Sequence, residues 1–370
     1  MNTNPNNKNE VTRTSRSRVL IGGVAALSLT AALTACAAGN EGGGSTSGLS
    51  GTINGAGSSA QSAAMDTWRK DFQSTNSAVT VNYDPSGSGA GVEAFLQKAV
   101  NFAGSDSALD AEKGEIDKAK QRCGADPIEV PNYVSPIAVV FNVSGVKELK
   151  LTPETLAKIF AGRITKWNDP AIAADNAQAK LPDTPIRPVH RSDESGTTKN
   201  FTDYLEKAAG GAWTSPADKV WPASLTGEAA AQTSGMVATV KQTEGSIGYA
   251  DLSAAKGLPL AAIKVGDAFV APSEEGAGKA LEVSKTDDSR GATDLVVKLD
   301  RATTESGAYP LALVSYLIGC PTTSGDQGKL IKDFFGYVVS SEGQEAAAKG
   351  AGSAPLPATL QEKAASIVKG

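Results

Sequence analysis

Three short segments rich in glycine, serine and threonine each stand between a stretch with strand character and a stretch with helix character. They are residues 55–59 (GAGSS), 86–91 (SGSGAG) and 193–198 (DESGTT). Such a turn leaves backbone N–H groups free at the start of the helix, where the helix dipole also favours negative charge. Serine or threonine at one such turn is usually an ordinary helix cap. Three of these turns in one chain predict a site for an anion.

The stretch around Arg191 adds a cation to these turns. Arg191 ends a predicted strand, and Ser195, Gly196 and Thr197 follow where a helix is expected to begin. A guanidinium group is a rigid fork that matches two oxygens of an oxyanion, and hydroxyls and backbone N–H groups can serve the other oxygens. Asp193 is close enough in sequence to hold the arginine side chain, although aspartate at this place also forms turns on its own.

An acidic residue, Asp106, lies in a turn of small residues at 102–107 (FAGSDS). A loop aspartate is ordinarily solvated or caps a neighbouring backbone group. In an anion site it has a sharper use, because it can accept a hydrogen bond from an oxyanion that still carries a proton. Phosphate keeps a proton near neutral pH, whereas sulfate has none and would leave two acceptors facing each other. Asp106 and Arg191 together therefore favour a protonated oxyanion.

The elements that position these residues alternate between short strands and helices. This alternation predicts an α/β fold with mostly parallel sheets. No repeat of fixed period interrupts it. Strands are expected at residues 52–57, 79–83, 137–142, 186–190 and 311–318, and helices at residues 60–73, 91–100, 153–160, 198–208, 325–339, 344–349 and 358–368.

The bulk composition is that of an ordinary globular protein. The chain has 370 residues, 40% of them hydrophobic and 20% charged, with a formal net charge of −5. This length suits two domains of usual size. Because no basic patch runs along the chain, nucleic acid is not an expected partner.

The N-terminal residues predict export. Basic residues precede an apolar run at residues 19–33, which is short for a membrane span, and small residues then lead to Cys36. This arrangement is typical of a secretory signal, and a cysteine directly after the small residues is typical of a lipoprotein signal. An ordinary signal peptide that happens to contain a cysteine is the alternative. We expect a signal peptide at residues 1–35, a lipid on Cys36 and a flexible Gly/Ser tether at residues 36–49.

Export also bears on the two remaining cysteines, Cys123 and Cys320. An even pair in an oxidising compartment favours a disulfide, and two buried free thiols are the alternative. Two cysteines and the single histidine, His190, cannot build a structural zinc site without help from carboxylates. We therefore expect no metal and no cofactor.

Taken together and in this order, the motifs resemble the phosphate-specific substrate-binding proteins of ABC importers. The resemblance covers nearly the whole chain after residue 50 and includes residues 161–168 (AGRITKWN) and 245–249 (GSIGY). It implies an α/β fold of the periplasmic-binding-protein type, in which two lobes, each a mixed sheet flanked by helices, are joined by two hinge strands. The lobes of such a protein close on a dehydrated phosphate ion.

The resemblance also assigns roles to individual residues. Asp106 matches the carboxylate that accepts the phosphate proton, and Asp193 matches the acid that pairs with Arg191. The family often has an aromatic residue where this chain has Ala60, whose backbone N–H group is kept by the change. Residues 265–299 match poorly, and we assign them no role. The implied phosphate-binding set is Ser59, Ala60, Ser88, Asp106, Arg191, Ser195, Gly196 and Thr197.

In a fold of this type the chain crosses twice between the lobes. We place the crossings near residues 131–135 and 306–310. Lobe I is then residues 50–132 with 307–370, and lobe II is residues 133–306. Both cysteines outside the leader fall in lobe I, so a bridge between them would lie inside one domain.

The expected function is capture of inorganic phosphate at the outer face of the cytoplasmic membrane and delivery to the transmembrane subunits of an ABC permease, by a lipid-anchored monomer that is not an enzyme. Another oxyanion, such as molybdate or sulfate, is one alternative. A secreted phosphatase with Ser195 as nucleophile and His190 as base is another, although a phosphatase normally needs metals or a histidine nucleophile. A sensor or adhesin that keeps the fold is the third.

Overall fold

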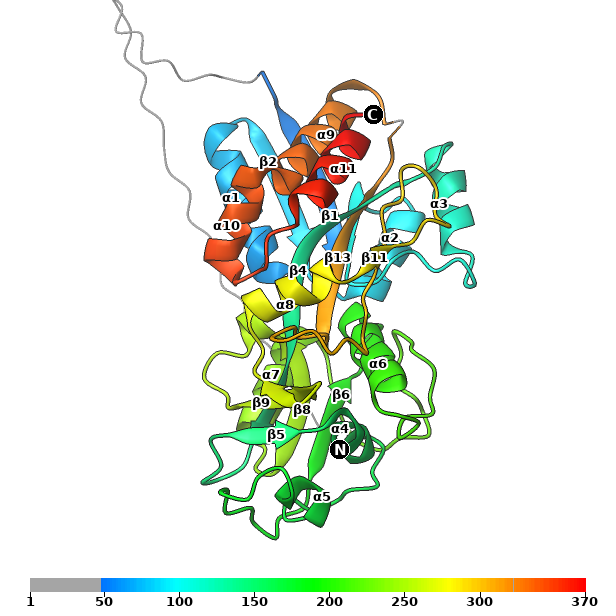
Figure 1. Ribbon diagram of the computed structural model, residues 1–370. Helices are drawn as coiled ribbons and strands as arrows, with labels where there is room; N and C mark the ends of the chain where they lie inside the picture. The colour runs from blue at the N-terminus through cyan, green and yellow to red at the C-terminus, as the bar shows by residue number, and fades with distance from the viewer. Residues whose placement is uncertain (1–47, 322) are drawn as a thin grey trace, which may run out of the picture. The chain divides into compact units, whose positions relative to one another are not determined.

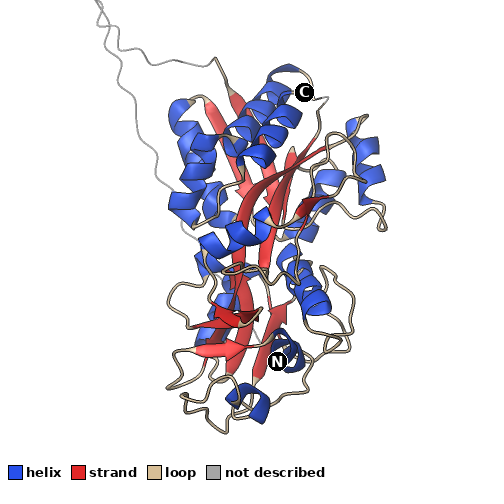
Figure 2. Cartoon of the chain, in the orientation of Figure 1, coloured by secondary structure: helices blue, strands red, loops and turns tan. Residues whose placement is uncertain are grey.

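One long strand, β4 (Ile128–Asn142), connects two groups of strands. Its residues 128–136 pair antiparallel with β13 (Ala312–Gly319), and its residues 137–142 pair antiparallel with β8 (Ser246–Asp251). The strand order through both groups is β2 (Val79–Asp84), β1 (Gly51–Gly57), β3 (Phe102–Ser105), β13, β4, β8, β6 (Arg187–Arg191) and β7 (Glu228–Ala230). Figure 2 shows the strands running on from one group into the other with helices on both sides.

The computed structural model describes residues 48–321 and 323–370, all within one compact unit, Thr46–Gly370. The predicted signal peptide, Cys36 and the tether up to residue 47 lie outside the described residues. Within the described part of the chain, no helix combines the length and the apolar character needed to cross a bilayer.

The first group of strands is β1, β2, β3 and β13. β1 pairs in parallel with both β2 and β3, and β13 runs antiparallel to β3. The packing is dense: Trp68 is fully buried, and its indole N–H donates to the carbonyl of Gly343 at 2.7 Å, which fixes α1 against α10. The helices of this group, labelled in the upper half of Figure 1, are α1 (Ser62–Thr75), α2 (Ser88–Leu96), α3 (Glu115–Cys123), α9 (Gly325–Val339), α10 (Ser341–Ala351) and α11 (Ala358–Lys369).

The second group lies around the other half of β4. β8 pairs in parallel with β6, and β9 pairs with β4, β5 and β10. A cluster of aromatic rings fills the space under α6, where Phe201 and Tyr249 stack with centroids 4.2 Å apart. The strands are β5 (Leu149–Leu151), β6 (Arg187–Arg191), β7 (Glu228–Ala230), β9 (Leu260–Val265) and β10 (Ala268–Val270). The helices are α4 (Pro153–Phe160), α5 (Pro170–Ala173), α6 (Gly196–Ala208), α7 (Gln232–Gln242) and the 3₁₀ turn η1 (Leu252–Ala254).

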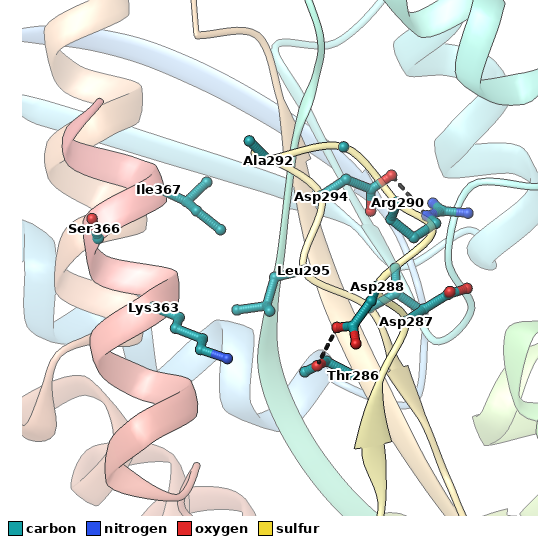
Figure 3. Close-up of a pocket in the computed structure, with 12 residues that line it drawn as sticks. Thr286, Asp287, Asp288, Arg290, Ala292, Asp294, Leu295, Lys363, Ser366 and Ile367 are labelled. Carbon is teal, nitrogen blue, oxygen red and sulfur yellow. Dashed lines mark hydrogen bonds and ion pairs between the residues drawn. The ribbon is translucent and has the colours of Figure 1, made fainter.

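The segment to which the sequence assigned no role returns to the first group. After α8 (Glu274–Glu282), the hairpin of β11 (Lys285–Thr286) and β12 (Val297–Lys298) lies against β4 and β13. The backbone N–H of Leu295 donates to the carbonyl of Glu129 at 2.8 Å. A cavity of about 390 Å³ lies between this hairpin and α11, as Figure 3 shows, and none of the expected phosphate-binding residues lines it.

A disulfide ties the end of α3 to the residue after β13. It joins Cys123 and Cys320, whose Cα atoms lie 5.1 Å apart. Cys123 is the last residue of α3 and Cys320 directly follows β13, so the bridge lies within the first strand group.

The predicted α/β class is confirmed, and most predicted elements agree with the structure to within two or three residues. The expectation of mostly parallel sheets is wrong in part, because β8 and β13 run antiparallel to β4. The helix expected at residues 91–100 is α2, which begins at Ser88 and ends at Leu96. β4 extends well before the expected residues 137–142, because residues 128–136 find a partner in β13.

Candidate functional site

The three predicted turns and the turn of Asp106 meet at one place. β1 and β3 are parallel neighbours, so the turn at Ser59 and the turn at Asp106 lie at the same edge of the sheet. The start of α6 comes to the same edge from the other strand group. A Cβ atom placed on Gly196 would stand only 2.7 Å from the Oγ of Ser88 and 2.8 Å from the Cβ of Asp106. Only glycine at position 196 lets the start of α6 approach Ser88 and Asp106 this closely.

The Arg191 side chain is buried, with 2% of it exposed, and is held as a fork. Its Nε donates to Oδ1 of Asp193 at 2.8 Å, and its Nη2 donates to Oδ2 of Asp193 and to Oγ of Ser59 at 3.2 Å. Burial alone would raise the pKa of Asp193, but its hydrogen bonds to Arg191 and the charge of that residue outweigh burial, so this pKa lies below its usual range. Asp193 is therefore ionised at neutral pH, and it fixes the direction of the guanidinium group.

Asp106 is buried to 98% between the two strand groups. The hydroxyl of Thr197, from α6, donates to its Oδ2 at 3.0 Å, and the hydroxyl of Ser315, from β13, donates to its Oδ1 at 2.7 Å. Burial raises the pKa of Asp106, and hydrogen bonds with the neighbouring hydroxyls and the charge of Arg191 offset only part of that rise. The carboxyl group is thus an acceptor held dry and in a fixed orientation.

The remaining predicted residues lie around these two. Ser195 is the N-cap of α6, and its Oγ accepts from the N–H of Thr198 at 3.2 Å. Ser88 is the first residue of α2, and its Oγ accepts from the N–H of Asp106 at 3.2 Å. The N–H of Ala60 donates to the Oγ of Ser58 at 3.0 Å, within the same turn.

Three further residues belong to this cluster although sequence reasoning did not select them. Thr233, at the start of α7, donates from its N–H to the Oγ of Ser59 at 3.1 Å. Ser315 touches Asp106, and Ser58 lowers the pKa of Asp106 through a side-chain hydrogen bond. A signal existed for Ser315, which is the one serine or threonine within the apolar strand at residues 312–319.

The geometry does not favour the phosphatase alternative, because the Nδ1 of His190 and the Oγ of Ser195 already have other partners. The ring of His190 stacks on Trp221 with centroids 5.1 Å apart, and its Nδ1 is tied to the carbonyl oxygen of Arg191 at 2.9 Å. Ser195 uses its Oγ as a helix cap. Among residues 48–321 and 323–370, no group of three or more histidine, cysteine or acidic side chains is placed to hold a metal ion.

Comparisons with known proteins agree on the family and the fold. The profile of the PBP superfamily domain matches residues 42–342. "Phosphate-binding protein PstS2" of Mycobacterium bovis is 37% identical over 368 residues, covering 93% of this chain and 97% of that protein. "Phosphate-binding protein PstS 3" of Mycobacterium leprae is 38% identical over 298 residues, covering 76% of this chain and 77% of that protein.

Two solved structures have the same fold. One is a high-affinity periplasmic phosphate-binding protein, PfluDING, bound with phosphate, with a TM-score of 0.67 and 21% identity over 84% of this chain and 92% of that chain. The other is the phosphate-binding protein of Stenotrophomonas maltophilia, with a TM-score of 0.66 and 19% identity over 86% and 94%. The expected periplasmic-binding-protein-like fold is thereby confirmed.

Proposed function

Because this chain belongs to the PstS family of phosphate-binding proteins within the PBP superfamily, we propose that it binds inorganic phosphate outside the cytoplasm and delivers it to the transmembrane subunits of an ABC importer. The family consists of binding proteins and not of enzymes. A lipid on Cys36 would keep the protein, as a monomer, at the outer face of the cytoplasmic membrane.

The observation that carries this proposal is the convergence of one buried arginine and one buried aspartate from different strand groups. In the proposed complex, Arg191 takes two phosphate oxygens, and the N-terminus of α6 at Ser195, Gly196 and Thr197 takes another. A fixed Asp193 keeps the guanidinium group from turning away. These donors supply positive potential in a chain whose net charge is −5.

Asp106 is the proposed acceptor for the phosphate proton. A hydroxyl group can both donate and accept. When an oxygen of Asp106 accepts a hydrogen bond from the protonated phosphate, the Thr197 hydroxyl can turn and donate to another phosphate oxygen. Ser59, Ser88 and the N–H of Ala60 complete the proposed set from the first strand group. Because sulfate has no proton to offer Asp106, it is excluded by an unpaired contact between two acceptors.

We further propose that β4 and the chain before β13 are the hinge, with lobe I at residues 50–132 and 307–370 and lobe II at residues 133–306. Arg191 and Asp106 then come from different lobes, so phosphate bridges them and favours the closed state over the open one. The contact of Leu295 with the start of β4 suggests one refinement: the β11–β12 hairpin moves with lobe I.

The test is isothermal titration of residues 46–370 with phosphate, sulfate and molybdate. We expect tight binding of phosphate alone. Arg191→Ala should weaken it by roughly a hundredfold or more, since the phosphate charge is left buried without its partner. Arg163, an exposed residue after α4, gives the matched control: Arg163→Ala should bind as the wild type does. Unchanged affinity in Arg191→Ala would refute the site.

A further inference from the structure

Three ion pairs connect the segment that follows Asp106 with α6 and the loop after it. Asp110 Oδ2 lies 3.0 Å from Lys199 Nζ, and Lys113 Nζ lies 2.8 Å from Asp218 Oδ2. The third pair joins Glu115 and Lys219 at 2.9 Å. Residues 110–115 follow β3 of the first strand group, whereas the other partners follow β6 of the second. All three pairs therefore cross the boundary between the proposed lobes.

Lys199 and Asp110, which pair with each other, and Lys219 are connected to residues of the proposed phosphate site. Lys199 lies one helical turn after Ser195, to whose carbonyl its N–H donates at 3.1 Å. The carbonyl of Lys219 accepts from the N–H of Ser195 at 2.9 Å. Asp110 and Asp106 are joined by a short stretch that begins directly after β3. The ion pairs thus form where closure brings α6 onto the turn of Asp106.

The pair of Glu115 and Lys219 is the one that closure would affect most. The side chain of Lys219 is 2% exposed and that of Glu115 is 14% exposed. Both carboxylate oxygens of Glu115 lie within 3.1 Å of the Lys219 Nζ, and Oε2 also accepts from the N–H of Asp110 at 2.7 Å. Glu115 is thus fixed by its own segment, and Lys219 reaches it from the other lobe. A buried ammonium group without its partner is strongly unfavourable.

We propose that these three ion pairs, the closure latch, hold the two lobes together and set the rate at which phosphate leaves. The latch rests on the proposed function. Its residues do not touch phosphate: they are positioning residues that stabilise the closed state. In the open state the same six side chains are separated and hydrated. Removing a pair therefore speeds reopening, whereas the encounter of phosphate with the open protein is left nearly unchanged.

The experiment measures release of radiolabelled phosphate from the protein after a chase with unlabelled phosphate, and association in parallel. Glu115→Gln keeps the shape and removes the charge. We expect its dissociation rate to rise about tenfold or more, with the association rate within about twofold of wild type. Wild-type release should also quicken with salt. Glu154→Gln, which breaks the exposed pair with Lys158 inside α4, is the control and should leave both rates unchanged.

A charge reversal on the exposed pair makes the test independent of any folding defect in Glu115→Gln. Lys113→Asp sets two carboxylates against each other at side chains that are 47% and 37% exposed, and should speed release by about threefold. Adding Asp218→Lys restores an attractive pair and should return the rate to that of wild type. Wild-type protein that binds no phosphate would overturn the proposed function. Wild-type protein that binds phosphate, with release unchanged in both single variants, would overturn the latch alone.

Discussion

The role proposed for Asp106 leads to a prediction about selectivity. In Asp106→Asn one carboxylate oxygen becomes an amide N–H₂ donor, while the shape of the side chain stays the same. The phosphate proton loses a charged acceptor, a contact of about 1.5–3 kcal/mol, so phosphate affinity should fall by roughly 10- to 150-fold. The affinity for sulfate should rise instead, because the new amide N–H can donate a hydrogen bond to a sulfate oxygen. The ratio of sulfate to phosphate dissociation constants should therefore drop by roughly 10²–10⁴.

The fold should tolerate this replacement. The hydroxyls of Thr197 and Ser315 now donate to the two oxygens of Asp106, and a hydroxyl that faces an amide N–H can accept instead. Burial raises the pKa of Asp106, so the folded state holds the proton more tightly than the unfolded state. Wild-type stability therefore falls as pH rises from the usual carboxyl range to that raised pKa. A neutral amide escapes this loss, and its unfolding free energy at pH 7 should be no lower than that of wild type.

The assay is titration calorimetry with both anions at fixed pH and ionic strength, together with urea unfolding of the free protein. The matched control is Asp117→Asn, an exposed aspartate of α3, which should keep both the affinity and the selectivity of wild type. An Asp106→Asn protein that is folded and still rejects sulfate as strongly as wild type would refute the proton-acceptor role. Phosphate discrimination would then have to come from the donors of Arg191 and α6 alone.

Two other predictions concern stability and location. Burial raises the pKa of Asp251, whose oxygens accept from the hydroxyl of Tyr133 at 3.1 and 3.2 Å, from 3.8 to about 6. Between pH 4 and pH 6, wild type should lose about 2 kcal/mol of unfolding free energy relative to Asp251→Asn, as measured by urea unfolding. Parallel pH profiles of the two proteins would contradict the shift. Cys36→Ser should move the protein from the membrane fraction into the medium, and a variant that stays membrane-bound would contradict the lipid anchor. Light scattering of the released protein should give the mass of a monomer, and the mass of a dimer would contradict the monomeric state.

Local sequence was enough to predict the parts of the site that lie within one turn. Arg191 is the last residue of a strand, and Asp193 follows two residues later. This spacing alone brings a guanidinium and a carboxylate together, and the structure has the bidentate contact. The cap at Ser195 is equally local. The residue types and their order along the chain also indicated the α/β class, because strand and helix periods are legible in short windows.

Contacts between distant segments could not be predicted in the same way. Ser315 reaches Asp106 because β13 pairs antiparallel with β3 in a register that sets Tyr316 opposite Ser105. A shift of one residue would turn Ser315 to the other face of the sheet. Thr233 likewise depends on where α7 begins relative to Ser59. The register between two strands that are far apart in sequence cannot be inferred from the sequence of either strand alone.

The ion pairs of the closure latch also join segments that are distant in sequence, so the sequence alone did not predict them. Asp110, Lys113 and Glu115 look like an ordinary solvated charge run, since a lysine between two acids is typical of an exposed surface. Their partners become evident only when α6 is placed against them. In this proposal, Arg191 and Asp106 recognise the ligand. Residues that do not touch phosphate determine how long the closed state lasts. Selectivity and residence time would accordingly respond to different mutations, a separation that equilibrium affinity alone would not reveal.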